Sequence, residues 1–399
     1  MKYKITAIIA TVFLGISMIL YAKNNITAIT EKYDGEVFSL STVKEIVLSL
    51  RNNDSENVPS KMKYIELHGL YSEITDKSCI VDIGYDVTKL DNDYLMFTGF
   101  ENVDTDLEKY SDNLARFAEH LSENDIGLLF VKIPEKVSSD EKKQKLGIIN
   151  SVNPDIDGFI PLLEKKGVDY IDLEECFKND SLDLCEMFFK TDHHWLPQTG
   201  LYACGKISQK LNDSYGYKTS EDLFDVDNYT VKTYEKSFIG SHGRRTGGLF
   251  SSSDDFSLVY PKFDTDLTVI TKDTGEVKQG SFYDVIFSME YLSEKPFSYT
   301  NSYSVYLAGD RAKQVIVNNN PPNDKKIVLI RDSYSAVAAP FLSLLCSEVH
   351  LLDLRRCTDI SAADYINEVG ADTVIVMYSP FMFVEGSSAF DFLSADIKK

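Results

Sequence analysis

Residues 325–342 read KKIVLIRDSYSAVAAPFL, and this stretch gives the strongest indication of the fold class. Its first half is an apolar run that ends in a polar turn made of Arg331, Asp332 and Ser333. The residues that follow, 334–345, are mostly apolar and predict a helix. A strand that passes through a turn into a helix is the repeating unit of an α/β sheet, and it puts Ser333 at the carboxyl end of the strand.

The same alternation of strand and helix occurs on both sides of this stretch. Downstream, strands are predicted at 348–356 and 371–379, with a helix at 360–369 between them. Upstream, the predicted elements are, in order, a strand within 91–99, a helix over 104–121, a buried strand over 126–134, a helix around 159–166 and a strand over 168–173. The repetition predicts a doubly wound parallel sheet.

The segment between these two parts, roughly 225–310, has a different character. It is rich in Tyr, Phe, Ser, Asp and Thr, apolar and polar residues alternate in it, and the Thr-Gly-Glu at 274–276 is interpreted as a hairpin turn. We therefore expect a β-rich insertion in an α/β domain that spans 91–399. Residues 23–90 are polar and mixed, and we interpret them as a stalk and an N-terminal subdomain.

Composition excludes several classes of protein. The 399 residues include 43% hydrophobic residues, which is enough for a packed core and excludes bulk disorder. The 41 basic and 62 acidic side chains give a net charge of −21. A surface of this sign repels phosphate backbones, so we expect no nucleic-acid partner.

The N-terminus, residues 1–22, indicates the compartment. Lys2 and Lys4 precede an uncharged run of 18 residues, Ile5–Ala22, which is just long enough to span a bilayer as a helix. The basic flank favours a cytoplasmic N-terminus with the remainder outside. The alternative is a signal peptide cleaved after Ala22, but Leu20 then stands where a small residue is required. We expect an uncleaved signal anchor and an extracytoplasmic domain at the cell membrane.

The chain has six cysteines, and outside the cytoplasm they are allowed to form disulfides. No Cys-x-x-Cys spacing occurs, so the sequence does not support a structural zinc site. Disulfides and buried free thiols both remain open as interpretations. The cysteines are Cys79, Cys176, Cys185, Cys204, Cys346 and Cys357.

Ser333 is a candidate nucleophile because a serine at a strand-to-helix turn projects into the crevice at the sheet edge. The alternative is a serine that only caps the following helix, which is one of the commonest roles of serine. A serine nucleophile needs a base and an acid that orients the base.

The stretch TDHHWLPQTG, residues 191–200, supplies both groups. Asp192 and His194 are two positions apart, so in an extended or turn conformation they point the same way, and the carboxylate can hold the imidazole. A metal site made of Asp192, His193 and His194 is an alternative, as is a surface turn without function. Adjacent histidines point in opposite directions and the sequence shows no further ligand cluster, so we expect no metal.

The tetrapeptide Asp192-His193-His194-Trp195 resembles the signature of the DHHW proteins, which are similar to the periplasmic alginate O-acetylation proteins of the SGNH hydrolase-like superfamily. In that group the serine block follows the Asp-His block, a circularly permuted order that this chain shares. The resemblance covers about 90–399. It includes VKIPEK (131–136), IGSHGRRTG (239–247), the serine block at 325–342 and HLLDLRR (350–356).

Carried over position by position, the resemblance implies that Ser333 is the nucleophile, His194 the base and Asp192 the residue that orients the base. His193 is then a packing or substrate-side residue. Arg331 stands where SGNH proteins usually have glycine, and no clear Gly-x-Asn-Asp block follows the third strand.

Three further residues are candidates for contacts with the oxyanion or the substrate. Arg355 and Tyr378 lie at the next predicted strand ends, and Trp195 lies beside the Asp-His pair. For Arg355 and Tyr378 the alternatives are an ion-paired arginine and a tyrosine that only forms part of a wall.

The resemblance implies an O-acetyltransferase that works through an acyl-serine and needs no cofactor. It further implies a glycan acceptor, either an exopolysaccharide or a cell-wall glycan, and a membrane-bound O-acyltransferase as the partner that supplies the acyl group. Two alternatives stay open: a secreted carbohydrate esterase with the same triad, and a noncatalytic glycan-binding scaffold of a membrane O-acyltransferase complex.

The predicted signal anchor has a direct test. Because the apolar run lacks a small residue at the required position before Ala22, the protein isolated from its native membrane should keep residues 1–22. N-terminal sequencing checks this. A mature chain that begins at Lys23 would show a cleaved signal peptide instead.

Overall fold

The computed structural model of the chain describes residues 61–81, 86–98, 105–137, 156, 158–384 and 387–393, together with Thr11 and Gly15. The signal anchor predicted for 1–22 lies outside these ranges apart from those two residues. Among the described residues, the structure has no helix with the length and apolar character needed to cross a membrane.

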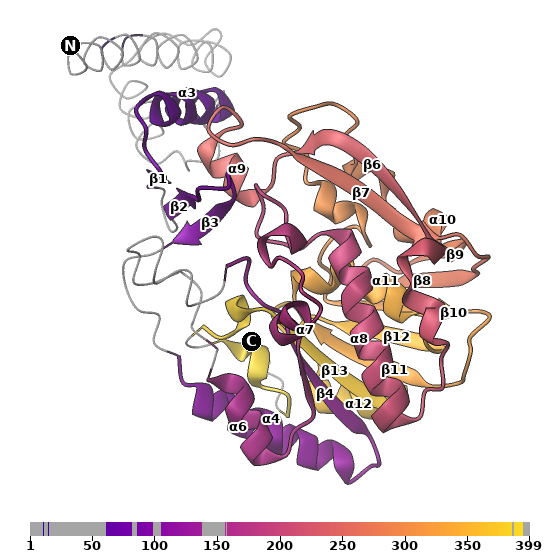
Figure 1. The fold of residues 1–399 in the computed structure, drawn as a ribbon. Helices are drawn as coiled ribbons and strands as arrows, with labels where there is room; N and C mark the ends of the chain where they lie inside the picture. The colour runs from indigo at the N-terminus through magenta and orange to yellow at the C-terminus, as the bar shows by residue number, and fades with distance from the viewer. Residues whose placement is uncertain are drawn as a thin grey trace, which may run out of the picture.

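An eight-stranded sheet forms the centre of the fold, with strand order β5-β4-β13-β11-β12-β10-β8-β9 (Figure 1). Its strands are β4 (Gly127–Lys132), β5 (Tyr170–Asp172), β8 (Leu267–Thr271), β9 (Glu276–Gly280), β10 (Lys313–Asn318), β11 (Lys326–Arg331), β12 (Glu348–Leu352) and β13 (Thr373–Tyr378). The five strands from β5 to β12 run parallel. The strands predicted at 126–134, 168–173, 348–356 and 371–379 and before Arg331 are therefore confirmed in this sheet, whereas the strand predicted within 91–99 is β3 (Leu95–Thr98) of a separate antiparallel sheet.

The other three strands differ from the prediction of a wholly parallel sheet. β10 pairs antiparallel with β12, and the β8–β9 hairpin continues the sheet beyond β10. Two strands of the β-rich segment thus extend the main sheet, because the open edge of β12 offers unpaired backbone groups that β10 satisfies. The hairpin turn predicted at 274–276 is confirmed between β8 and β9.

Helices cover both faces of the sheet, as a doubly wound fold requires. Residues of α4 (Leu107–Ser122), α6 (Phe159–Lys166) and α12 (Ala362–Val369) form one core cluster with Val328, Val374 and their neighbours. Residues of α7 (Leu173–Asn179), α8 (Pro197–Tyr215) and α11 (Ala339–Leu342) form the other with Leu329 and Ile375. Figure 1 shows α4 and α8 on opposite sides of the strands.

The helix predicted over 334–345 is broken into two short pieces. A 3-10 helix, η7 (Ser333–Ala336), comes first, and α11 begins three residues later. Pro340 has no N–H and lies in the first turn of α11, a position that proline favours at the start of a helix rather than in its interior.

Before the main sheet, the chain forms α3 (Lys61–Ile74) and a small antiparallel sheet. The strands of that sheet are β1 (Cys79–Ile80), β2 (Asp86–Lys89) and β3 (Leu95–Thr98). α3 packs on α9 (Ser241–Thr246), which follows β6 (Tyr229–Phe238) of the hairpin with β7 (Asp254–Pro261). Figure 1 shows α3, β3 and α9 gathered at one end of the molecule.

The remaining described elements are short. They are α10 (Phe282–Ile286), η2 (Cys185–Met187), η3 (Glu221–Phe224), η4 (Val226–Asn228), η5 (Met289–Tyr291), η6 (Ser302–Val305), η8 (Pro380–Met382) and η9 (Ser388–Phe390). All six cysteines are free thiols, and four of them are buried. Of the two interpretations left open by the sequence, the structure therefore has free thiols and not disulfides.

Candidate active site

The three side chains of the predicted triad lie in one hydrogen-bonded chain. Asp192 Oδ1 is 2.6 Å from His194 Nδ1, and His194 Nε2 is 2.8 Å from Ser333 Oγ. Asp192 is 1% exposed, whereas Ser333 is only partly buried and lies at the carboxyl end of β11. The structure thus brings together a serine, a histidine and a buried aspartate in the hydrogen-bonded order that serine acyl transfer uses.

The loop that carries the acid and the base is tightly closed. Phe188 and Trp195 pair across it as an antiparallel bridge, and the Phe189 N–H donates to the carbonyl of His194 at 3.2 Å. Inside the loop, the N–H of His194 donates to Asp192 Oδ1 at 2.9 Å, which is the local turn that Asp commonly forms two residues ahead. This turn places both side chains on one side of the loop.

The second carboxylate oxygen of Asp192 is held by another segment. The N–H of Ser241, at the start of α9, donates to Oδ2 at 2.6 Å. Burial alone raises the pKa of Asp192, but the charges of His193 and His194 and the hydrogen bonds from His194 outweigh it and hold the pKa well below its ordinary value. Asp192 is therefore an ionised carboxylate, as the orienting acid of a triad must be.

Gly240 makes this contact possible. A Cβ at position 240 would lie 2.2 Å from Asp192 Cβ and 2.4 Å from Oδ2. Only glycine allows the backbone to approach the carboxylate so closely. The Gly-Ser pair of the segment 239–247 therefore serves to seat the acid.

The turn that carries Ser333 is pinned to the neighbouring strand by Asp332. One carboxylate oxygen of Asp332 accepts from the N–H of Tyr334 at 3.0 Å and so caps η7. The other accepts from the N–H and the hydroxyl of Ser379, just after β13, at 2.8 and 2.6 Å. These bonds fix the direction in which Ser333 leaves the sheet.

Reciprocal hydrogen bonds join the acid-base loop to the serine turn. The indole N–H of Trp195 donates to the carbonyl of Tyr334 at 2.9 Å, and the Tyr303 hydroxyl donates to the same oxygen at 3.0 Å. In return, the Tyr334 hydroxyl donates to the carbonyl of His193 at 2.7 Å. We call this set of three bonds the Tyr334 clasp. It holds His194 at a fixed distance from Ser333.

Two rings enclose the imidazole of His194. The Tyr303 ring stacks on it with centroids 3.9 Å apart and planes at 12°, and the His193 ring lies at 3.8 Å with planes at 37°. His193 is itself held by Ser241 Oγ, 2.7 Å from its Nδ1. The pKa of His193 is lowered mainly by desolvation in this buried position, and to a smaller extent by the positive charge that His194 can carry.

Lys136, beyond the end of β4, is a buried cation beneath the same loop. Its Nζ donates to the carbonyl oxygens of Asp192 at 2.7 Å, Leu95 at 2.8 Å and Lys190 at 3.3 Å. All three ammonium protons therefore have acceptors. Burial lowers the pKa of Lys136 to about 8, against the opposing effect of Asp254 and Asp192.

A small hollow of about 30 Å³ lies beside His193, between β3 and the triad. A hollow of this size has room for at least one water molecule. Phe97 meets the ring of His242 edge-on there, with centroids 4.2 Å apart. The hollow is lined by Met96, Phe97, Glu135, Lys136, Val137, His193, His242, Tyr334 and Phe381.

The three candidate substrate contacts are all engaged with other groups of the protein. Trp195 is 0% exposed, and its N–H is used in the Tyr334 clasp. Arg355 is ion-paired with Asp353 and Asp310, at 2.6 and 3.3 Å. Their placement gives no support to a substrate role for Trp195, and it matches the ion-paired alternative for Arg355.

Tyr378 belongs to the core on the other face of the sheet. It packs against Phe390, and its hydroxyl donates to the carbonyl of Ala389 at 2.7 Å. Its cluster is that of α4 and α12, whereas Trp195, Tyr303 and Tyr334 belong to the cluster of α8. A contact between Tyr378 and a substrate at Ser333 finds no support in this arrangement.

Arg331, which replaces a glycine of the SGNH pattern, lies under the serine turn with no exposed surface. Its Nη1 is 3.5 Å from Asp310 Oδ1 and donates to the carbonyl of Asp332 at 3.4 Å. The guanidinium thus brings a buried positive charge to the backbone next to Ser333 without blocking access to the serine.

Asp192, His193 and His194 also form the metal-binding alternative considered for the sequence. Their potential ligand atoms lie within 4.8 Å of one another. Both nitrogens of His194 are engaged, however, one with Asp192 and the other with Ser333. A metal ion there would displace a hydrogen bond of the triad, so the arrangement fits acid-base chemistry better than metal binding.

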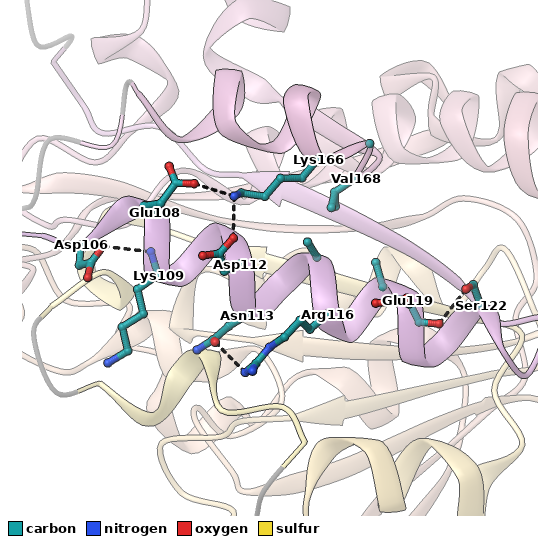
Figure 2. A pocket seen from close by; sticks show the side chains of 13 residues that line it. Asp106, Glu108, Lys109, Asp112, Asn113, Arg116, Glu119, Ser122, Lys166 and Val168 are labelled. Carbon is teal, nitrogen blue, oxygen red and sulfur yellow. Dashed lines mark hydrogen bonds and ion pairs between the residues drawn. The ribbon is translucent and has the colours of Figure 1, made fainter.

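A much larger hollow, of about 1020 Å³, lies along α4 and α6 (Figure 2). Its most prominent feature is Lys166, whose Nζ bridges Glu108 and Asp112 at 2.7 and 2.6 Å. None of the triad residues lines it. Exposed ion pairs of this kind contribute little free energy.

Several residues of the site have no role assigned from the sequence, among them Ser241, Lys136 and Tyr303. Ser241 and Lys136 lie in segments that the family resemblance included, and those segments were the available signal. Tyr303 had no such signal, because it is one of several tyrosines in the β-rich segment and only the fold brings it to His194.

Comparison with known proteins supports the same fold. The model of a family described as the SGNH hydrolase-like domain of acetyltransferase AlgX matches residues 95–234, which include Asp192 and His194. In this segment the chain is therefore related to acetyltransferases of the SGNH type. A comparison with curated proteins gives no match.

Solved structures with a similar fold include Bacillus cereus PatB1, with 22% sequence identity and a TM-score of 0.62 over 77% of this chain and 100% of PatB1. PatB1 with a sulfonyl adduct gives 21% identity and a TM-score of 0.62 over 78% and 100%. A DHHW family protein from Eubacterium siraeum gives 20% identity and a TM-score of 0.58 over 78% and 96%. The chain has an SGNH-like α/β fold, and the resemblance predicted from the sequence is confirmed.

Gly240→Ala tests how the acid is seated. The new Cβ would overlap Asp192, so the carboxylate must move, and a displacement of about 1 Å costs on the order of 100-fold in turnover. Gly205→Ala in α8 is the matched control, because its Cβ would meet nothing closer than 3.5 Å. Turnover of an acetyl ester by both variants checks this. Equal activity of the two variants would contradict the proposed role of Gly240.

Lys136 predicts a pH dependence of stability. Between pH values of about 8 and 10.5, the unfolded chain keeps the proton on Lys136 while the folded chain releases it, so raising the pH in this window favours the folded state. The free energy of unfolding of the wild type, measured relative to Lys136→Met, should therefore rise across the window. Chemical denaturation at several pH values measures it. A difference that stays constant with pH would show that Lys136 titrates normally.

Proposed function

We propose that this protein transfers an acyl group through Ser333, and that the group is acetyl and the acceptor a glycan. The observation that carries the proposal is the hydrogen-bonded chain from buried Asp192 through His194 to partly exposed Ser333. The match of residues 95–234 to an acetyltransferase domain supports the choice of transferase and of acetyl.

The first half of the reaction acylates the serine. His194 Nε2 takes the Ser333 proton as Oγ bonds to the acyl carbonyl carbon of the donor ester or thioester. The tetrahedral intermediate then collapses, the bond from carbon to the donor oxygen or sulfur breaks, and His194 returns the proton to that leaving group. Asp192 stabilises the imidazolium and holds its Nδ1 proton throughout.

The second half is the same chemistry in reverse. A sugar hydroxyl gives its proton to His194 as its oxygen attacks the acyl-serine, and the bond between the carbonyl carbon and Ser333 Oγ breaks. His194 then returns the proton to Ser333. Every proton and electron pair is accounted for by the donor, the acceptor and these three residues, so the reaction needs no cofactor.

The partners of the protein are part of the proposal. Similarity to the alginate O-acetylation proteins supports a membrane-bound O-acyltransferase as the source of the acyl group, and an exopolysaccharide or cell-wall glycan as the acceptor. In residues 1–22, two lysines precede an apolar run. This pattern supports a single-pass anchor with the catalytic domain outside the cytoplasm.

The direct test incubates the full chain with an acetyl ester, with and without an acceptor oligosaccharide. Acetylated oligosaccharide formed faster than free acetate supports the transferase. Free acetate alone, at a rate that the oligosaccharide does not change, would show the esterase. If neither product forms, the noncatalytic scaffold is left as the function.

Ser333→Ala and Asp192→Asn test the roles of the triad. Ser333→Ala should lower kcat/KM by a factor of about 10⁴ or more while costing about 1 kcal/mol of stability at most, since the serine is a small residue at a turn. Asp192→Asn should lower kcat by about 10³ to 10⁴, because the amide holds the wrong tautomer of His194. Kinetics with an acetyl ester, together with thermal unfolding, check both.

The neighbouring histidines provide the control for these variants. His194→Ala should abolish acyl transfer, whereas His193→Ala should be milder, because His193 contacts Ser241 and not Ser333. If His193→Ala were the more damaging change, the base would be assigned to the wrong histidine. If all these variants stayed active, serine chemistry would be excluded.

A further inference from the structure

Tyr303, from η6 of the β-rich segment, lies flat against the proposed base. Its ring centroid is 3.9 Å from that of His194, and the two planes differ by 12°. The planes are closer to parallel here than in the other ring contacts of His194, which are with His193 at 37° and Tyr334 at 57°. A face-to-face contact of this kind covers one whole side of the imidazole.

Tyr303 has no freedom to leave this position. It is 4% exposed, and its hydroxyl donates to the carbonyl of Tyr334 at 3.0 Å. That carbonyl belongs to the residue directly after Ser333. The same side chain therefore touches the base with its ring and the nucleophile's turn with its hydroxyl, so any shift of the ring would disturb both.

We propose that Tyr303 is a positioning residue for His194: its ring holds the imidazole in the plane of Asp192 and Ser333, and its π face stabilises the imidazolium formed when His194 takes the serine proton. The inference rests on the proposed serine chemistry. It adds to that chemistry a fourth side chain, supplied by the β-rich segment that interrupts the α/β units.

The ionisable groups around His194 come from three elements. Asp192 and His193 lie on its own loop, Ser333 and Tyr334 on η7, and Tyr303 on η6. Burial, and then the charge of Asp192, raise the pKa of Tyr303 well above its ordinary value. The phenol therefore stays neutral and keeps donating its hydrogen bond to the Tyr334 carbonyl at any pH at which the enzyme is folded.

Tyr306 is a matched control for Tyr303. It lies three residues further along, is 0% exposed, and has its hydroxyl engaged with the N–H of Val259 and the carbonyl of Ser257. Its ring contacts are with Phe256 and Phe287, away from the triad. Truncating Tyr306 creates a comparable cavity in the same segment without exposing the imidazole.

The experiment measures how fast phenylmethanesulfonyl fluoride labels Ser333 in the full chain as a function of pH, by mass spectrometry of the Ser333 peptide. Labelling needs a neutral base, so the labelling rate falls at low pH as His194 becomes protonated. We call this fall the acidic limb of the pH profile. The variants are Tyr303→Phe, Tyr303→Leu and Tyr306→Leu, with thermal unfolding to show that each is folded.

Tyr303→Leu removes the π face, so the imidazolium is less stable and the acidic limb should move to lower pH by about 0.4 to 1.5 units. Its plateau rate should fall about tenfold or more, because the imidazole loses its fixed plane. Tyr303→Phe keeps the face and should leave the limb within about 0.2 units of the wild type. Tyr306→Leu should leave the limb unmoved.

An acidic limb that does not move in Tyr303→Leu, or that moves equally in Tyr306→Leu, would overturn the inference and make Tyr303 a core residue only. If Tyr303→Leu fails to fold, Tyr303→Met removes the face while filling more of the space, and the same criteria apply. A wild-type chain that is not labelled at Ser333 would overturn the proposed function itself, whereas normal labelling with an unmoved limb would overturn the role of Tyr303 alone.

Discussion

The arrangement of the site depends on the Tyr334 clasp. Trp195 and Tyr303 both donate to the carbonyl of Tyr334, and the Tyr334 hydroxyl donates back to the carbonyl of His193. These bonds join the acid-base loop and η6 to the turn after Ser333, and Trp195 and Tyr334 are 139 residues apart in the sequence. The sheet brings Ser333 to the carboxyl end of β11, and the clasp helps to hold His194 Nε2 within hydrogen-bond distance of Ser333 Oγ.

Burying the acid of the triad requires that every oxygen be satisfied, since an unpaired buried carboxylate is very costly. Asp192 receives the N–H of His194, the imidazole of His194 and the N–H of Ser241. Lys136 meets the carbonyl of Asp192 from below. Gly240 allows the Ser241 N–H to come close to the carboxylate, and this donor forms one polar network with the donors of the loop. Loss of one member leaves a buried group without its partner.

Much of the fold and of the candidate triad could be predicted from local sequence patterns. The apolar run before Ser333 indicated the strand end, and the two-residue spacing of Asp192 and His194 indicated a shared face. Tyr378 shows the limit of such reasoning: side chains alternate along β13, so Met377 faces the α8 cluster while Tyr378 faces the α4 cluster, although both end the same strand. The antiparallel addition of β10 and the stacking of Tyr303 on His194 arise from contacts between distant segments, which periodicity does not encode.

A trapped intermediate would test most directly whether Ser333 carries the acyl group. The full chain is mixed with an acetyl ester, quenched in acid on the timescale of one turnover, and digested, and the peptide that contains Ser333 is analysed by mass spectrometry. We expect an acetyl group on Ser333 that disappears when an acceptor oligosaccharide is added before the quench. Acetyl transfer to the oligosaccharide with no acetyl on Ser333 at any quench time would contradict it.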